Sequence, residues 1–298
     1  MRTLFPVETT VRVDENCRLW VQSRGDEHAV PVLLVMGANT SGLGWPERFV
    51  DELAERYRVV RYDHRDTGRS SRVFDEHPYA IRDLATDAVA VLDALDIERA
   101  HVVGMSMGGV LVQLLLLDHP HRLRSATLFG SAALGAQLAG GSEEGDGLPG
   151  VDPRLLAMWE RIFEQRSPEE ELAWRVEHWR LLNGDVLEFD PDWFRELERR
   201  IMAHSGTHRE SWAHASADTG GLDRGDELIG VTTPTLVIEA PEDPVAPPPH
   251  AEYLARALGG AKRVEIPGMG HALGEPVLGP LVSTIRRHVE EVEAERRG

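Results

Sequence analysis

The stretch HVVGMSMGGVLVQLLLLDHP, residues 101–120, decides how the chain folds. It holds one serine, Ser106, with Gly104 two residues before it and Gly108 two residues after it. The apolar run before the serine predicts a buried strand, and the apolar run at residues 110–117 predicts a helix. A lone hydroxyl therefore stands at the junction of two buried elements.

This junction fits G-x-S-x-G, the pattern of a nucleophile elbow between a strand and a helix. The serine of an elbow occupies a tight, strained turn that lifts its hydroxyl above the sheet. A side chain two residues to either side would collide with the neighbouring strand or helix, so glycine is favoured there. The alternative is a serine that only caps the helix. The strand before it and the helix after it favour the elbow.

A serine hydroxyl becomes a good nucleophile only when a base takes its proton. Among 13 histidines, His271 stands just beyond the last predicted strand, in a loop that can reach back over Ser106. Asp243 follows the strand before that one, and Pro244 after it favours a fixed turn. Glu242 is the competing carboxylate, and the shorter Asp243 suits the loop better. Structural or solvated roles are expected for His101, His119, His121 and His178.

Backbone N–H groups are expected to stabilise the oxyanion that forms during attack on a carbonyl. Met107, next to Ser106, offers one such group at the N-terminus of the predicted helix, where the helix dipole favours negative charge. The second group is expected from Ala38, in the loop after the predicted strand at residues 31–37.

The rest of the chain alternates short apolar runs with helical patterns, which predicts an α/β fold with a mainly parallel sheet covered on both faces. The predicted strands are residues 31–37, 57–63, 100–105, 124–130, 234–240 and 262–268. Residues 10–25 alternate and break at residues 14–16, which predicts an antiparallel hairpin at the sheet edge.

The alternation stops between residues 130 and 228, where helix-start signals take its place. Three N-caps, each followed by proline at the first helical position, are expected at Asp152, Ser167 and Asp190. Glu170 completes a capping box at the second of them. We therefore expect a core of residues 1–133 and 223–298, with a helical cap of residues 134–222 inserted between strands.

Five of the seven tryptophans lie in the predicted cap: Trp159, Trp174, Trp179, Trp193 and Trp212. They can supply the buried area that a small helical layer needs. They can also form an aromatic wall for a bulky substrate. Helical spacing favours the first interpretation.

At these motifs the chain resembles the α/β-hydrolase fold, and within it the esterase group that includes aclacinomycin methylesterase. The resemblance covers nearly the whole chain and rests on LLVMGANTSGLGWP, VVRYDHRDTGRSS, AHVVGMSMGG, TPTLVIEAPEDPVAPPPH and IPGMGHAL. It implies Ser106 as nucleophile, Asp243 as acid, His271 as base, and Ala38 and Met107 as oxyanion donors. The chain departs from the pattern at Met36, where histidine often stands, and at Ala38, where a second glycine is expected.

Composition excludes several classes of partner. The formal net charge of −18 argues against nucleic acid or an anionic membrane surface. Cys17 is the only cysteine, which excludes an internal disulfide and a cysteine-based metal site. The segment YDHRDTGRSS, residues 62–71, is expected to form a buried polar network that braces the loops around the elbow, rather than a metal or phosphate site.

These features predict a serine hydrolase that cleaves small-molecule carboxylic esters through an acyl-enzyme, with no cofactor and no metal. A lactonase, a C–C hydrolase or a perhydrolase would use the same site, since one scaffold hosts many chemistries. A binding module without catalysis is the alternative from another class. The absence of an apolar segment long enough to span a membrane, and of a secretory signal, predicts a cytoplasmic protein. A homodimer is compatible with the sequence.

Overall fold

The computed structural model describes residues 6–136, 147–209 and 211–298. Within these ranges the central element is an eight-stranded sheet with the order β1-β2-β4-β3-β5-β6-β7-β8. Its strands are β1 (Val7–Arg12), β2 (Arg18–Arg24), β3 (Pro31–Val35), β4 (Arg58–Tyr62), β5 (Ala100–Met105), β6 (Leu123–Phe129), β7 (Thr235–Glu239) and β8 (Lys262–Glu265). β2 runs antiparallel to both of its neighbours, and the other pairs are parallel.

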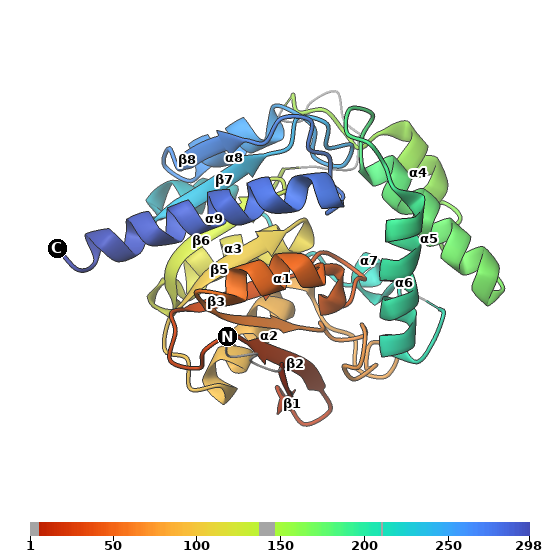
Figure 1. Cartoon of the computed structure of the whole chain (residues 1–298), viewed down its shortest axis with the longest axis horizontal. Coiled ribbons are helices and arrows are strands. Elements are labelled where there is room, and N and C mark those ends of the chain that lie inside the picture. The colour runs from red at the N-terminus through yellow and green to blue at the C-terminus, as the bar shows by residue number, and fades with distance from the viewer. Residues whose placement is uncertain (1–5, 137–146, 210) are drawn as a thin grey trace.

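Helices cover both faces of the sheet (Figure 1). One face carries α1 (Glu47–Ala54) and α9 (Glu275–Glu295), and the other carries α2 (Ile81–Ala94), α3 (Met107–Asp118) and α8 (His250–Ala257). Successive strand residues point to opposite faces, so Leu33 joins the core under α2 and α3 while Leu34 joins the core under α1 and α9. Both side chains are fully buried. The sheet thus separates two hydrophobic cores.

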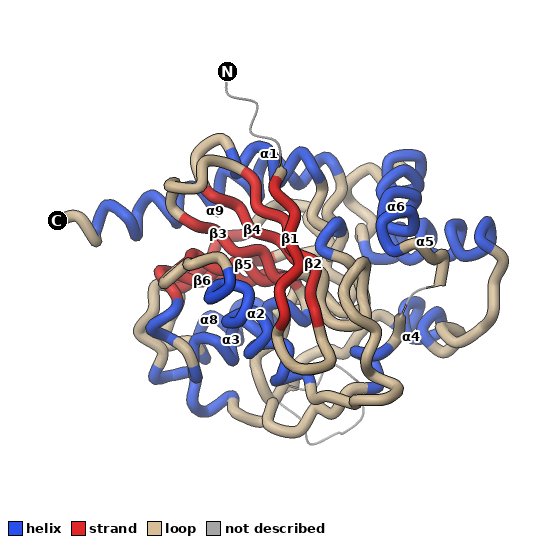
Figure 2. The backbone as a smooth tube through the Cα atoms, turned by 90° about the horizontal axis from the view of Figure 1, so that it is seen from below, coloured by secondary structure: helices blue, strands red, loops and turns tan. Residues whose placement is uncertain are grey.

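A third group of helices follows β6 and precedes β7: α4 (Pro153–Trp159), α5 (Pro168–Leu182), α6 (Pro191–Ser205) and α7 (Ala213–Ser216). Figures 1 and 2 both show α4, α5 and α6 beyond one end of the sheet. These helices have a core of their own, which includes Leu155, Trp179 and Phe194. Short 3-10 turns complete the chain: η1 (Gly42–Gly44), η2 (Pro120–Arg122) and η3 (Gly225–Gly230).

The predicted helix starts are confirmed. Asp152 accepts the amide of Arg154, Ser167 and Glu170 form the reciprocal capping box, and the carboxylate of Asp190 caps α6. Residues 137–146 of the predicted cap lie outside the described residues. The division of the chain into a core and a cap domain stays a prediction.

The predicted strands and the edge hairpin are also confirmed, with small shifts at their ends. β3 ends at Val35, so Met36 and Gly37 belong to the loop that approaches the site. None of the helices in the described part of the chain is both long and apolar enough to cross a membrane.

Candidate active site

Ser106 joins β5 to α3 in a strained conformation, with φ 57° and ψ −125°. A non-glycine residue at positive φ is uncommon and needs support from its surroundings. A Cβ on Gly104 would overlap the backbone of Gly108, and a Cβ on Gly108 would overlap the carbonyl of Val35 on β3. The predicted need for glycine on both sides of the serine is confirmed, because helix and strand backbones fill the space.

The loops after β7 and β8 bring Asp243 and His271 together. Asp243 Oδ2 lies 2.8 Å from His271 Nδ1, and Oδ1 accepts the amides of Val245 (2.7 Å) and Ala246 (3.0 Å). Burial raises the pKa of Asp243, but His271 and the two amides outweigh it and hold the pKa below its ordinary value. Because an ionised carboxylate only accepts hydrogen bonds, neutral His271 carries its proton on Nδ1 and leaves Nε2 unprotonated.

Gly130, at the end of β6, makes room for this pair. A Cβ there would lie 3.0 Å from His271 Cε1 and Nδ1, and 3.3 Å from Asp243 Oδ2. Gly130 also has a positive φ of 57°, which glycine adopts at little cost. The sequence showed only a glycine after a strand, so its role was missed. Glu242, the competing carboxylate, has no hydrogen bond to His271, and its amide donates to the carbonyl of Met269.

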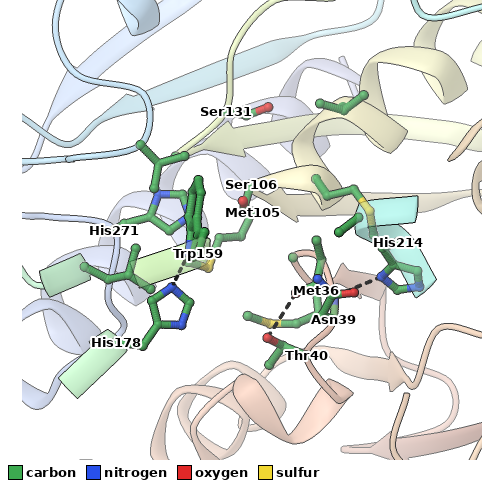
Figure 3. A pocket seen from close by; sticks show the side chains of 18 of the residues that line it. Met36, Asn39, Thr40, Met105, Ser106, Ser131, Trp159, His178, His214 and His271 are labelled. Carbon is green, nitrogen blue, oxygen red and sulfur yellow. Dashed lines mark hydrogen bonds between the residues drawn. The ribbon is translucent and has the colours of Figure 1, made fainter. Parts of the chain in front are cut away.

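A cavity of about 430 Å³ lies between the carboxyl ends of the central strands and the helices that follow β6. Ser106, His271, Ala38 and Met107 all line it, while Asp243 is buried behind His271. In Figure 3 the ring of His271 lies on one side of Ser106 and the ring of His214 on the other.

The amides of Ala38 and Met107 both remain without an acceptor among the described residues. Met107 is the first residue of α3, where N–H groups have no partner within the helix. The loop with Ala38 passes close to the serine, since a Cβ on Gly37 would lie 3.2 Å from Ser106 Cβ. Two residues with unpaired N–H groups therefore line the same cavity as Ser106.

The model of the family described as alpha/beta hydrolase fold matches residues 30–275. The chain belongs to the α/β-hydrolase fold family. Rhodomycin D methylesterase DauP of Streptomyces sp. (strain C5) and rhodomycin D methylesterase DnrP of Streptomyces peucetius are each 44% identical to it over 290 residues, which is 94% of this chain and 97% of the relative. A bromoperoxidase from Bacillus anthracis shares the fold, with a TM-score of 0.77, 21% identity, and coverage of 95% of this chain and 100% of that chain.

In this α/β-hydrolase the tryptophans between β6 and β7 divide into two groups. Trp159, Trp179 and Trp212 line the cavity, whereas Trp174 and Trp193 lie outside its lining. Trp179 also belongs to the core of α4, α5 and α6. Both interpretations drawn from the sequence therefore hold, and Trp179 fits both of them.

His214 on α7 holds the loop that carries Ala38. The amide of Asn39, which has a positive φ of 59°, donates to His214 Nδ1 at 2.9 Å. His214 Nε2 therefore carries the proton and donates to the carbonyl of Arg65 at 3.0 Å. Burial, followed by repulsion from His64, lowers the pKa of His214 to about 3. No local pattern in the sequence marks this contact, because its partners are 175 positions apart.

The segment of residues 62–71 forms the polar network that the sequence predicted. His64 Nε2 lies 3.0 Å from the carbonyl oxygen of Met36, and Arg65 donates two hydrogen bonds of 2.6 Å to Asp87. These contacts tie the loop after β4 to the loop after β3 and to α2. Over residues 6–136, 147–209 and 211–298, no three histidine, cysteine, aspartate or glutamate side chains gather in a group suited to a metal ion.

His178 on α5 was expected in a structural or solvated role, but it lines the cavity. The indole Nε1 of Trp159 donates to its Nε2 at 3.0 Å (Figure 3). This contact joins α4 to α5, so a single-sequence pattern could not reveal it.

Proposed function

We propose that this α/β-hydrolase is a carboxylic ester hydrolase that works through an acyl-enzyme. Ser106 is the nucleophile, His271 the general base, and Asp243 the group that orients His271. The observation that supports this most is the 2.8 Å contact between Asp243 and His271, beside a cavity that His271 shares with Ser106. That contact puts the proton on Nδ1, so Nε2 is available as a base.

The reaction follows from these roles. Ser106 Oγ attacks the ester carbonyl carbon while His271 Nε2 takes the hydroxyl proton. The N–H groups of Ala38 and Met107 stabilise the oxyanion of the tetrahedral intermediate. Protonated His271 then gives its proton to the leaving alcohol. Water repeats the sequence on the acyl-enzyme and releases the acid.

Asp243 contributes through its charge. Its pKa lies below the ordinary value, so it stays ionised over the working pH range and stabilises the imidazolium that forms on His271. Its second oxygen is occupied by the amides of Val245 and Ala246, which fixes the carboxylate in one orientation.

The substrate we propose has a bulky acyl part and a small alcohol. Trp159, Trp179 and Trp212 give the cavity a large apolar wall, which suits a ring system. The two relatives that share 44% identity are named as methylesterases, which supports methanol as the leaving alcohol.

The helices of residues 134–222 act in this proposal as a cap over the site. Trp159, His178 and Trp212, all from this segment, line the cavity with Ser106. A cytoplasmic location and a homodimer stay predictions.

A burst experiment with p-nitrophenyl butyrate tests the proposed function. The wild-type enzyme should release about one equivalent of nitrophenol per active site before steady turnover. Ser106→Ala should lose the burst and lower turnover by about a million-fold, while far-UV circular dichroism and the melting temperature stay those of a folded protein. Turnover retained by pure Ser106→Ala protein would refute the assignment. A panel of esters that varies acyl and alcohol size separately then tests the substrate.

A further inference from the structure

His178 is a polar group in the cavity wall that the reaction above does not use. It stands on α5, is partly exposed, and lines the same cavity as Ser106 and His271. Figure 3 shows its ring beside Trp159, on the side of the cavity where His271 lies.

The partner of His178 fixes which of its ring nitrogens carries the proton. The indole N–H of Trp159 can only donate, so His178 Nε2, at 3.0 Å, must accept and carries no proton. Burial, followed by repulsion from His271 and Arg175, lowers the pKa of His178 to about 4. The ring is therefore neutral near pH 7, and its proton is on Nδ1.

The Nδ1–H of His178 is a donor without an acceptor among the described residues; it is not one of the fully buried unpaired atoms, and it belongs to a residue that lines the cavity. The cavity lining holds two further histidines, His271 and His214, and both ring nitrogens of His214 are already hydrogen-bonded within the protein. Glu198, also on the lining, already accepts from Arg175 and from Trp179. A donor in the wall of an apolar cavity gains most from a ligand atom that accepts its hydrogen bond.

We propose that His178 determines substrate specificity by donating a hydrogen bond from Nδ1 to a neutral acceptor, such as a ring ketone or hydroxyl oxygen, on the acyl part of the ester. The inference rests on the proposed ester hydrolysis and extends it to a chemical class of substrate. A cationic group is disfavoured at this place, because it would face an N–H and would repel the imidazolium that forms on His271 during turnover.

Matched pairs of esters test this inference. Methyl 9-oxofluorene-1-, -2- and -4-carboxylate are compared with the corresponding methyl fluorene carboxylates, which have a methylene where the ketone stands. For at least one positional isomer, the wild-type kcat/KM should favour the ketone by roughly threefold to tenfold, the worth of one neutral hydrogen bond. Equal rates within all three pairs would overturn the inference.

Variants at position 178 separate a hydrogen bond from mere packing. His178→Asn places an amide N–H near the Nδ1 position and should keep part of the preference for the ketone. His178→Gln places its amide near the Nε2 position, and His178→Phe has no donor, so both should bring the ratio to about one. A ketone preference that survives in His178→Phe would overturn the inference. The matched control is His121→Phe on η2, an exposed residue at the far end of β6 from the cavity, which should keep the wild-type ratio.

Two measurements keep this inference independent of the proposed function. Nitrogen-15 chemical shifts of the His178 ring in the full chain should show the proton on Nδ1, and a proton on Nε2 would overturn the argument. Binding of 9-fluorenone and fluorene to Ser106→Ala, followed by tryptophan fluorescence, should show the same preference in Kd, and it should vanish in the Ser106→Ala, His178→Phe double variant. If no ester is cleaved while this preference is present, the proposed function fails and the binding role of His178 stands.

Discussion

Replacement of Asp243 by asparagine tests whether Asp243 keeps the proton of His271 on Nδ1 and so leaves Nε2 free to act as the base. Oδ1 of Asp243 accepts two amides, from Val245 at 2.7 Å and Ala246 at 3.0 Å. An asparagine at this position keeps those two bonds only if its carbonyl oxygen takes the place of Oδ1. Its NH₂ group then faces His271 Nδ1, where the carboxylate oxygen stood.

This exchange reverses the hydrogen bond to His271. The amide NH₂ donates, so Nδ1 must accept and the imidazole proton moves to Nε2. Nε2 is the atom that has to take the proton from Ser106, so the base is blocked in the ground state. The same substitution in a serine protease lowers kcat by about 10⁴, and we expect a loss of that order here, or about 5 kcal/mol in the activation free energy.

The assay is the steady-state hydrolysis of p-nitrophenyl butyrate by Asp243→Asn, with the melting temperature as a check on the fold. KM should change less than kcat, because Asp243 lies behind His271 and does not line the cavity. Glu242→Gln is the matched control and should turn over like the wild type, since Glu242 has no hydrogen bond to His271. Wild-type turnover in Asp243→Asn, or a larger loss in Glu242→Gln, would refute the assignment of the acid.

Two further predictions concern packing and acid stability. Gly108→Ala should unfold or inactivate the enzyme, because the new Cβ would overlap the backbone of Val35. Gly279→Ala on α9 is the control, since its Cβ meets open space and should stabilise the helix by about 1 kcal/mol. Urea titrations measure both, and wild-type stability and activity in Gly108→Ala would contradict the packing argument. His214 has a folded-state pKa of about 3 against 6.5 when unfolded, so its stabilisation is present above pH 6.5 and is lost as the pH falls. Between pH 7 and pH 5, the unfolding free energy of the wild type should therefore fall by about 2 kcal/mol more than that of His214→Phe. Parallel curves would show that folding does not lower the pKa of His214.

Much of the site was accessible from the sequence because its signals are local. Ser106 is marked by glycines that the backbones of α3 and β3 require, and the helix starts at Asp152, Ser167 and Asp190 are set by residues within one turn. The places of Asp243 and His271 after successive strands predicted that they lie close together, since the carboxyl ends of parallel strands share one edge of the sheet, and their 2.8 Å contact bears this out.

The residues that sequence analysis missed act through contacts between distant segments. Gly130 makes room for a histidine from the loop after β8, and His214 supports a loop 175 positions earlier in the chain. The sequence did not distinguish His178 from other histidines on the predicted cap helices, whereas the structure places its ring beside Trp159 in the lining of the cavity.

The amino-acid sequence by itself determined the alternation of strands and helices, the strained turn at Ser106 and the places of Asp243 and His271 after successive strands, because each depends on backbone sterics or on position along the chain. Only the tertiary structure decided which tryptophans line the cavity, which nitrogen of His178 carries a proton, and how His214 holds the loop that contains Ala38. Those properties depend on which donors and acceptors meet when α5 and α7 pack over the sheet, and that pairing has no period or spacing in the chain.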